Sequence, residues 1–218
     1  MENMTTIKKI NYFDESLKEY KSLRSNNKEI PNLLLHVCCG ACSAFPLIYL
    51  IDLFNITIYF SNSNIYPLEE FNKRKETLEK YVDIINKKFN KNIKIIADNY
   101  NYEEFKKDLI PFKDEKEGLN RCKICISKRL NRLFEYAKDN NYSLVSTVMS
   151  ISRNKDVYYI NEVGKSLEDK YNNIKFLVFD FKKFNGQDIG VAITKKYDIY
   201  RQNYCGCEFS KGSYERSN

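Results

Sequence analysis

Five short apolar runs, each followed by a longer segment of helical character, constrain the fold of this chain more than any other feature. The runs cover residues 33–37, 56–60, 93–97, 143–148 and 174–179, and apolar runs of this length are typical of buried strands. Helices are expected between them, near residues 43–54, 68–89, 102–110, 121–139, 156–170 and 187–197. Such alternation predicts a single α/β domain whose mostly parallel sheet is covered by helices.

The polar residues 1–30 are expected to form an N-terminal extension, and residues 31–218 a single functional domain. Apolar residues make up 43% of the 218 residues, which excludes a disordered chain. No uncharged apolar run approaches the roughly 20 residues needed to cross a bilayer, and the N-terminus lacks the apolar segment of a secretory signal. We therefore expect a cytoplasmic protein with no membrane partner.

The charge balance and the cysteine count narrow the function further. Lys and Arg total 36 against 29 Asp and Glu, a net charge of +7, which favours a polyanionic partner such as a nucleic acid. A solvated, lysine-rich surface is the alternative explanation of this charge. The seven cysteines cannot all pair within the chain, and clustered thiols in a reducing cytosol indicate metal binding or redox catalysis.

Two of the three cysteine groups have the spacing of metal ligands. The first, HVCCGAC at residues 36–42, follows the first core strand, where a nucleotide-binding α/β protein would carry a glycine-rich phosphate loop. Its three thiols and single glycine favour metal ligation instead. The second, RCKIC at residues 121–125, lies on an expected helix, so that both sulfurs share one face beside cations that favour thiolates.

Thiolates of Cys38, Cys39, Cys122 and Cys125 would satisfy either a zinc ion or a cubane [4Fe–4S] cluster. Structural zinc usually takes one C-x-x-C pair from each side, a geometry that adjacent cysteines fit poorly. Adjacent cysteines can, however, reach two corners of a larger cluster. The pattern therefore favours the cluster, with zinc as the alternative.

The third group is YCGC at residues 204–207. A disulfide between Cys205 and Cys207 would close a very small ring, and the strain expected there makes such a bond easy to reduce. A labile dithiol beside a cluster suits a two-electron reductase. The alternatives are a second metal site and a motif whose role is only to pack against the core.

These three groups, in this order, resemble the epoxyqueuosine reductase QueH family, formerly a domain of unknown function. The resemblance spans about residues 33–210 and is carried by LLLHVCCGACS, YFSNSNIYPLEEFNKR, EGLNRCKICISKRL, VSTVMSISRNK, FDFKKFNG and YRQNYCGCEFS. Ala41 stands where many relatives have Pro, and Leu119 where a second Gly often follows the Glu-Gly pair. Neither departure removes a thiol.

The resemblance implies the last step of queuosine synthesis, the cobalamin-independent two-electron reduction of epoxyqueuosine at the wobble position of tRNA. It also implies a core related to the adenine-nucleotide α-hydrolase and PP-loop proteins, and an electron donor that the sequence does not identify. By position, Cys38, Cys39, Cys122 and Cys125 would bind a [4Fe–4S] cluster, and Cys205 and Cys207 would form a redox-active pair. Cys42 is left over, either as a ligand of a second mononuclear metal or as a buried thiol.

Four polar residues beside the expected strand ends are further candidates. His36, the only histidine, would donate a proton to the opening epoxide or hold a neighbouring loop. Asp180 would ligate a second metal, act as an acid, or cap its loop. Asn62 and Asn64 would contact the substrate, although asparagine is also ordinary in turns.

Contacts to tRNA are expected from cations and tyrosines. The tyrosines Tyr66, Tyr200 and Tyr204 would stack on an unpaired anticodon base, or serve structural roles. Lys155 and Arg201 lie in segments that match the family. The full set of candidate phosphate contacts is Arg74, Lys128, Arg129, Arg132, Lys155 and Arg201, each of which has a solvated side chain as its alternative.

Two other functions compete with the reductase. A PP-loop-type tRNA thiolation enzyme needs a Ser-Gly-Gly-x-Asp-Ser phosphate loop after the first strand, and residues 38–43 do not form one. A zinc-stabilised RNA-binding module without catalysis would contain zinc in place of iron and sulfide.

Overall fold

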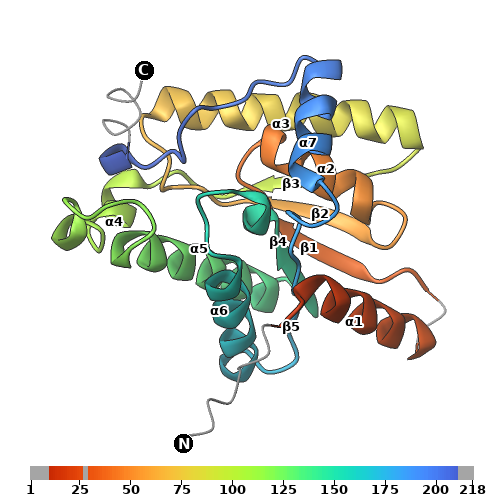
Figure 1. Cartoon of the computed structure of the whole chain (residues 1–218). Coiled ribbons are helices and arrows are strands. Elements are labelled where there is room, and N and C mark those ends of the chain that lie inside the picture. The colour runs from red at the N-terminus through yellow and green to blue at the C-terminus, as the bar shows by residue number, and fades with distance from the viewer. Residues whose placement is uncertain (1–9, 27–28, 211–218) are drawn as a thin grey trace, which may run out of the picture.

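The computed structural model describes residues 10–26 and 29–210. Parts of the extension expected at residues 1–30 and the last eight residues of the domain expected at 31–218 therefore lie outside the description. In chain order the elements are α1 (Tyr12–Asn26), β1 (Asn32–His36), α2 (Gly40–Leu50), β2 (Asn55–Phe60), α3 (Leu68–Phe89), β3 (Lys94–Ala97), α4 (Tyr102–Lys106), η1 (Ile110–Phe112), α5 (Asn120–Asp139), β4 (Leu144–Thr147), η2 (Val148–Ile151), α6 (Val157–Lys170), β5 (Lys175–Phe176) and α7 (Gly186–Lys196) (Figure 1).

The expected α/β class is confirmed by the sheet. Within the described residues it has five strands, all parallel, in the order β3-β2-β1-β4-β5. Side chains alternate between its faces, so Leu33 and Leu35 of β1 belong to one core and Leu34 to the other. Burial on both faces explains why the β1 sequence is a continuous apolar run.

Helices cover both faces of the sheet. On one face α2 packs against α3 and α7, and on the other α5 packs against α6 (Figure 1). Helix α1, from the expected extension, also contacts the domain, because Tyr20 packs on Phe54 and Glu19 pairs with Lys165. None of the described helices has the length and apolar character required of a membrane span.

Three elements differ most from the sequence-based prediction, and the first is α4, which ends at Lys106 and not at Ile110. Helix α2 begins at Gly40 and not near residue 43, because the Cys39 side chain caps the helix by accepting a hydrogen bond from the Cys42 N–H. Strand β5 has two residues and not six. Beyond it, Asn161 bonds both the N–H and the C=O of Phe179, and Ser146 donates to the Leu177 carbonyl. The Leu177 N–H still donates to the Val145 carbonyl of β4, and after this bond side chains replace the sheet hydrogen bonds of the segment.

The strand order reverses direction between β1 and β4. In open parallel sheets, ligands bind beyond the carboxyl ends of the strands at such a reversal. The segment 37–42 follows β1 and the segment 148–155 follows β4, so the first cysteine group borders this crevice. The order is compatible with the PP-loop-type core that the resemblance implies.

Candidate metal centre and substrate cavity

Three sulfurs lie together at the start of α2. Those of Cys38, Cys39 and Cys42 are all within 4.8 Å of one another, and no other group of three His, Cys, Asp or Glu ligands among the described residues is as close. The positive end of the α2 dipole favours negative charge on these sulfurs. Cys42, whose role the sequence left open, therefore belongs to the tightest cysteine group.

The three thiols influence one another's ionisation. Hydrogen bonds from Cys39 and Cys42 hold the pKa of Cys38 well below its ordinary value, and Arg129 and Lys155 act in the same direction. Hydrogen bonding to Cys38 raises the pKa of Cys42 to about 11, and burial raises that of Cys39. The group thus carries one negative charge readily, and a second thiolate calls for a cation such as a bound metal ion.

The other four cysteines line a small cavity of about 30 Å³. Cys122 and Cys125 come from the first turns of α5, and Cys205 and Cys207 come from residues 200–210, the segment called the tail below. The Gly118 N–H donates to the Cys122 sulfur at 3.1 Å, from a backbone with φ of 97° that glycine adopts readily. Burial raises the pKa of Cys125 to about 11 and that of Cys207 to about 12.

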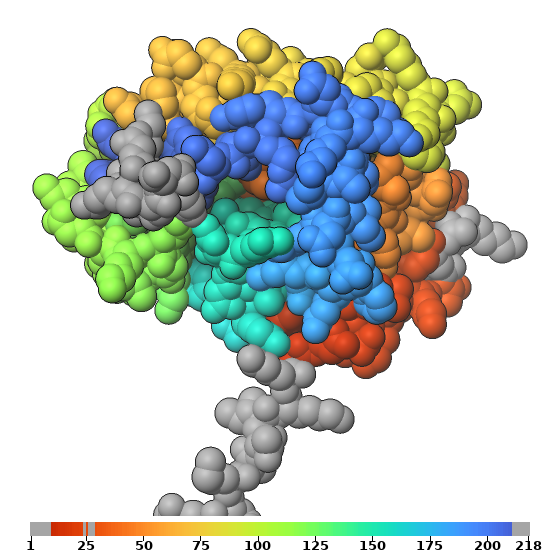
Figure 2. Space-filling view, turned by 45° about the horizontal axis from the view of Figure 1, so that its top comes forward, coloured from red at the N-terminus to blue at the C-terminus, as the bar shows by residue number. Residues whose placement is uncertain are grey.

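A larger cavity of about 360 Å³ adjoins the small one. Its walls include Cys38, Cys42 and Cys205, and it shares Cys205 and Lys155 with the small cavity. Figure 2 shows this face, where the dark blue tail crosses above the teal segment near residue 150, with α7 in lighter blue beside them. All three cysteine groups therefore converge at the reversal of strand order.

The larger cavity is cationic. Its lining contains no carboxylate, and its cations are Arg74, Arg129, Arg153, Lys155 and Arg201. Burial alone would lower the pKa of Lys155, but the sulfurs of Cys205 and Cys38 outweigh it and raise that pKa, so the side chain stays charged. These cations offset the charge of thiolates and suit an anionic ligand.

This donor set fits a thiolate-ligated metal centre. Thiolate sulfur binds both zinc and iron–sulfur clusters, and buried cations beside it compensate the negative charge. All seven cysteines, which lie within the described ranges, are free thiols. Cys122 and Cys125 are not part of the close group formed by Cys38, Cys39 and Cys42.

His36 lies outside the lining of both cavities and is fully buried. Its Nδ1 lies 2.9 Å from the Thr147 hydroxyl and its Nε2 lies 3.3 Å from the Ser61 carbonyl. Burial lowers its pKa to about 3, so the ring is neutral near pH 7. This arrangement favours the structural alternative, in which the ring ties β1 to neighbouring segments.

Three further candidates occupy loops after the strands. Asp180 lies outside the lining of both cavities and accepts a hydrogen bond from the Lys182 N–H, as a loop cap does. Asn62 is buried, donates to the Val37 carbonyl and accepts from Arg129. Asn64 lines the small cavity, and its buried Oδ1 has no hydrogen-bond partner among the described residues.

The structure divides the six cations proposed to contact phosphates. Arg74 and Arg129 are buried and line the larger cavity. Lys128 and Arg132 lie outside the lining of both cavities and pair with Asp108 and Asp98. Lys155 faces the sulfurs, and Arg201 is exposed at the larger cavity. Sequence reasoning missed Arg153, whose side chain is 74% exposed at the same cavity.

The expected stacking tyrosines are engaged with their neighbours. The Tyr200 hydroxyl donates to Glu70, and Lys73 lies 3.8 Å from the Tyr200 ring centroid. The Tyr204 hydroxyl donates to the Tyr66 carbonyl. Of the three rings, only that of Tyr204 lines the larger cavity.

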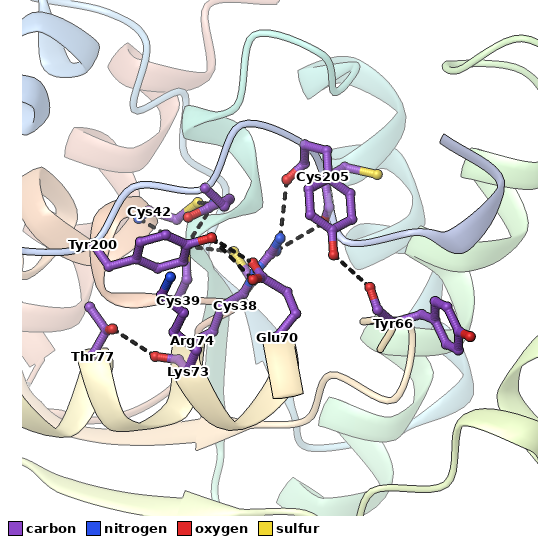
Figure 3. A network of polar contacts seen from close by, with 12 residues as sticks. Cys38, Cys39, Cys42, Tyr66, Glu70, Lys73, Arg74, Thr77, Tyr200 and Cys205 are labelled. Carbon is purple, nitrogen blue, oxygen red and sulfur yellow. Dashed lines mark hydrogen bonds and ion pairs between the residues drawn. The ribbon is translucent and has the colours of Figure 1, made fainter. Parts of the chain in front are cut away.

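Arg74 fastens the tail to α3 (Figure 3). Its guanidinium donates to the backbone carbonyls of Tyr204 and Cys205, both at 3.1 Å, and its Nε donates to Glu70 at 2.7 Å. A Cβ atom at Gly206 would lie 3.0 Å from the Arg74 Nη1, so glycine permits this close approach. Arg74 therefore fixes the backbone that carries Cys205 and Cys207.

Replacing Arg74 with Met is expected to lower the free energy of unfolding by about 3 to 5 kcal/mol, because Glu70, 12% exposed, loses its buried partner. Urea denaturation measures the change. The exposed Arg153→Met change is the control and should cost less than about 0.5 kcal/mol. Equal stability of the two variants would contradict the role of Arg74 in fastening the tail to α3.

Comparisons with known proteins agree with the family resemblance that the cysteine pattern indicates. The family model "Epoxyqueuosine reductase QueH" matches residues 33–213. Proteins named "Epoxyqueuosine reductase QueH" from Streptococcus pyogenes serotype M1 and Staphylococcus aureus are 34% and 36% identical, over 95% and 93% of this chain and 81% and 84% of their own lengths. The Thermotoga maritima protein of that name is 35% identical over 82% of this chain and 89% of its own length.

Proposed function

The chain belongs to the epoxyqueuosine reductase QueH family, and on this basis we propose that it reduces epoxyqueuosine in tRNA to queuosine without cobalamin. The observation that carries the proposal is the convergence of three cysteine groups on two adjoining cavities, the larger of them lined by cations, at the reversal of strand order. Neither a thiolation enzyme nor a zinc-stabilised RNA-binding module is favoured by the comparisons.

The thiols of the tail match the stoichiometry of this reaction. Converting an epoxide to an alkene breaks both C–O bonds, consumes two electrons and two protons, and releases water. Oxidation of the Cys205 and Cys207 thiols to a disulfide releases two electrons and two protons, so the two half-reactions balance. An external electron donor would then return the disulfide to the dithiol through exchange chemistry.

We assign Cys38, Cys39, Cys122 and Cys125 as the residues that would hold a [4Fe–4S] cluster, and Cys42 as a ligand of a second metal. A bound cluster supplies one-electron transfer next to the substrate. The lowered pKa of Cys38 supports this assignment, because the neighbouring thiols and the charges of Arg129 and Lys155 favour a thiolate at this end of the sheet.

The remaining cavity residues would bind the modified nucleotide. A volume of about 360 Å³ lies in the range of small-ligand sites, about 300 to 1,000 Å³. Arg153 and Arg201, at its exposed side, would contact phosphates, while Lys155 would face both the substrate and Cys205. Tyr200 would contact the anticodon loop from the rim.

Metal analysis of anaerobically purified protein, followed by turnover of tRNA carrying epoxyqueuosine, tests this function. We expect iron, acid-labile sulfide, a broad absorbance band and conversion to queuosine in the presence of a chemical reductant. Zinc without iron or sulfide, together with RNA binding but no conversion, would support the zinc-stabilised module in its place.

Binding of the anticodon stem-loop is expected to weaken at least tenfold between about 50 mM and 200 mM salt, because each neutralised phosphate releases a counterion. The salt slope is the slope of the logarithm of the binding constant against the logarithm of the salt concentration. Removing one phosphate contact reduces the magnitude of this slope by about one. We therefore expect a lower slope for Arg153→Gln and Arg201→Gln in fluorescence titrations. The control Lys87→Gln, on the exposed side of α3 beside Asp83, should keep the wild-type slope. Binding that is independent of salt would indicate a free nucleoside substrate.

A further inference from the structure

Gln202 is a polar residue of the tail whose side chain contacts two sulfurs of the close cysteine group. Its Nε2 lies 3.1 Å from the Cys39 sulfur and 3.6 Å from the Cys42 sulfur, in each case as a hydrogen-bond donor. The residue also lines the larger cavity. Its contact with Cys39 spans 163 positions of the chain, so it joins the tail to the start of α2.

The orientation of this carboxamide suits sulfurs that are bound to a metal. Its Oε1 is buried and has no hydrogen-bond partner among the described residues, an arrangement that costs about 1 to 3 kcal/mol. A thiol S–H would donate to that oxygen if the amide were turned around. The N–H groups instead face the sulfurs, which suits sulfurs that only accept, as thiolates and metal-bound thiolates do.

The position of Gln202 is held from the tail. Two and three residues further along, the carbonyls of Tyr204 and Cys205 accept hydrogen bonds from Arg74 (Figure 3). The amide therefore approaches Cys39 and Cys42 from a segment whose backbone is fastened to α3. Donors held in this way are typical of residues that orient metal ligands and tune the metal centre.

We propose that Gln202 is a positioning residue that donates N–H···S hydrogen bonds to Cys39, assigned above to the cluster, and to Cys42, assigned to a second metal, and that through Cys39 it raises the reduction potential of the cluster. The inference rests on the proposed function. Reduction adds negative charge to a thiolate-ligated centre, and N–H dipoles directed at its sulfurs stabilise the reduced form more than the oxidised form. The same segment carries Cys205, so the tail would both tune the centre and present the dithiol.

The test is a redox titration of the anaerobically purified protein. Absorbance and electron paramagnetic resonance monitor the titration, and the iron content of each sample is measured in parallel. Gln202→Leu removes the donor without adding charge, and Gln202→Glu replaces the donor with a carboxylate of similar shape that adds negative charge beside the sulfurs. Both variants are expected to keep their iron, with a one-electron reduction constant about tenfold lower, a shift of about 59 mV to more negative potential. Gln187→Leu is the matched control: Gln187 lines the same cavity, and its amide donates to the Ile151 carbonyl, so the wild-type potential is expected.

The other possible outcomes distinguish a failure of this inference from a failure of the proposed function. An unchanged potential in both Gln202 variants, with iron present, overturns the inference and leaves the proposed function standing. Loss of iron from both variants assigns Gln202 to assembly of the centre and overturns a role in its potential. Wild-type protein without iron and sulfide overturns the inference together with the iron–sulfur part of the proposed function.

Discussion

Replacing Cys38 or Cys122 with Ser is expected to reduce iron, sulfide and turnover by about 100-fold or more. Loss of a residue that merely orients a metal ligand already costs about 10- to 100-fold, and loss of the ligand itself should cost at least as much. Cys39→Ser and Cys125→Ser should behave in the same way. Iron and sulfide assays on anaerobically purified variants measure the effect, and circular dichroism verifies that each variant is folded.

Cys42→Ser is the matched control for this prediction. Cys42 lies in the same close group as Cys38 and Cys39, yet we assign it to a second metal, so its replacement should leave the cluster absorbance and sulfide content in place. The reverse result, with the cluster lost from Cys42→Ser and kept in Cys122→Ser, would show that the cluster is held by the close group and that the ligand assignment is wrong.

Replacing Cys205 or Cys207 with Ser is expected to leave iron and sulfide unchanged and to abolish multiple turnover. The reason is the electron balance, because a lone thiol cannot supply two electrons by forming an internal disulfide. Both residues line the small cavity, and Cys205 also lines the larger one. Gly206 between them has φ of 105°, a backbone conformation open to glycine.

Thiol titration before and after one turnover without external reductant tests the role of this pair directly. The wild-type protein should lose two thiols for each product formed, and Cys205→Ser should lose none. Cys42→Ser is again the control and should still lose two. Product formed by the wild-type protein with an unchanged thiol count would exclude the dithiol as the source of electrons and favour metal ligation by Cys205 and Cys207.

Much of the fold could be predicted from local patterns. The β1 run LLL is apolar at successive positions because both sheet faces are covered, so its burial is visible in the sequence. The start of α2 was placed too late, because the cap is a cysteine sulfur and not one of the usual capping residues. The length of β5 depends on side-chain hydrogen bonds from Ser146 and Asn161, which link distant positions.

The candidate site was predictable in its sulfur chemistry and not in its surroundings. C-x-x-C spacing places Cys122 and Cys125 on one helical face in any context. Arg74 and Arg129 were expected at the RNA surface, but the structure buries both beside the cavities. Charge is a property of the residue type, whereas burial depends on which other segments pack around it.

The sequence by itself determined the parallel α/β architecture, the thiol character of the site and the family, because strand–helix alternation and cysteine spacing are local properties of the chain. Only the tertiary structure decided that Cys42 joins Cys38 and Cys39, that Arg74 fastens the tail, and that Gln202 faces the sulfurs. The physical reason is that the reversal of strand order brings the segments after β1 and β4 to one edge of the sheet. The tail then packs across that edge, and its contacts reach more than 100 positions back along the chain.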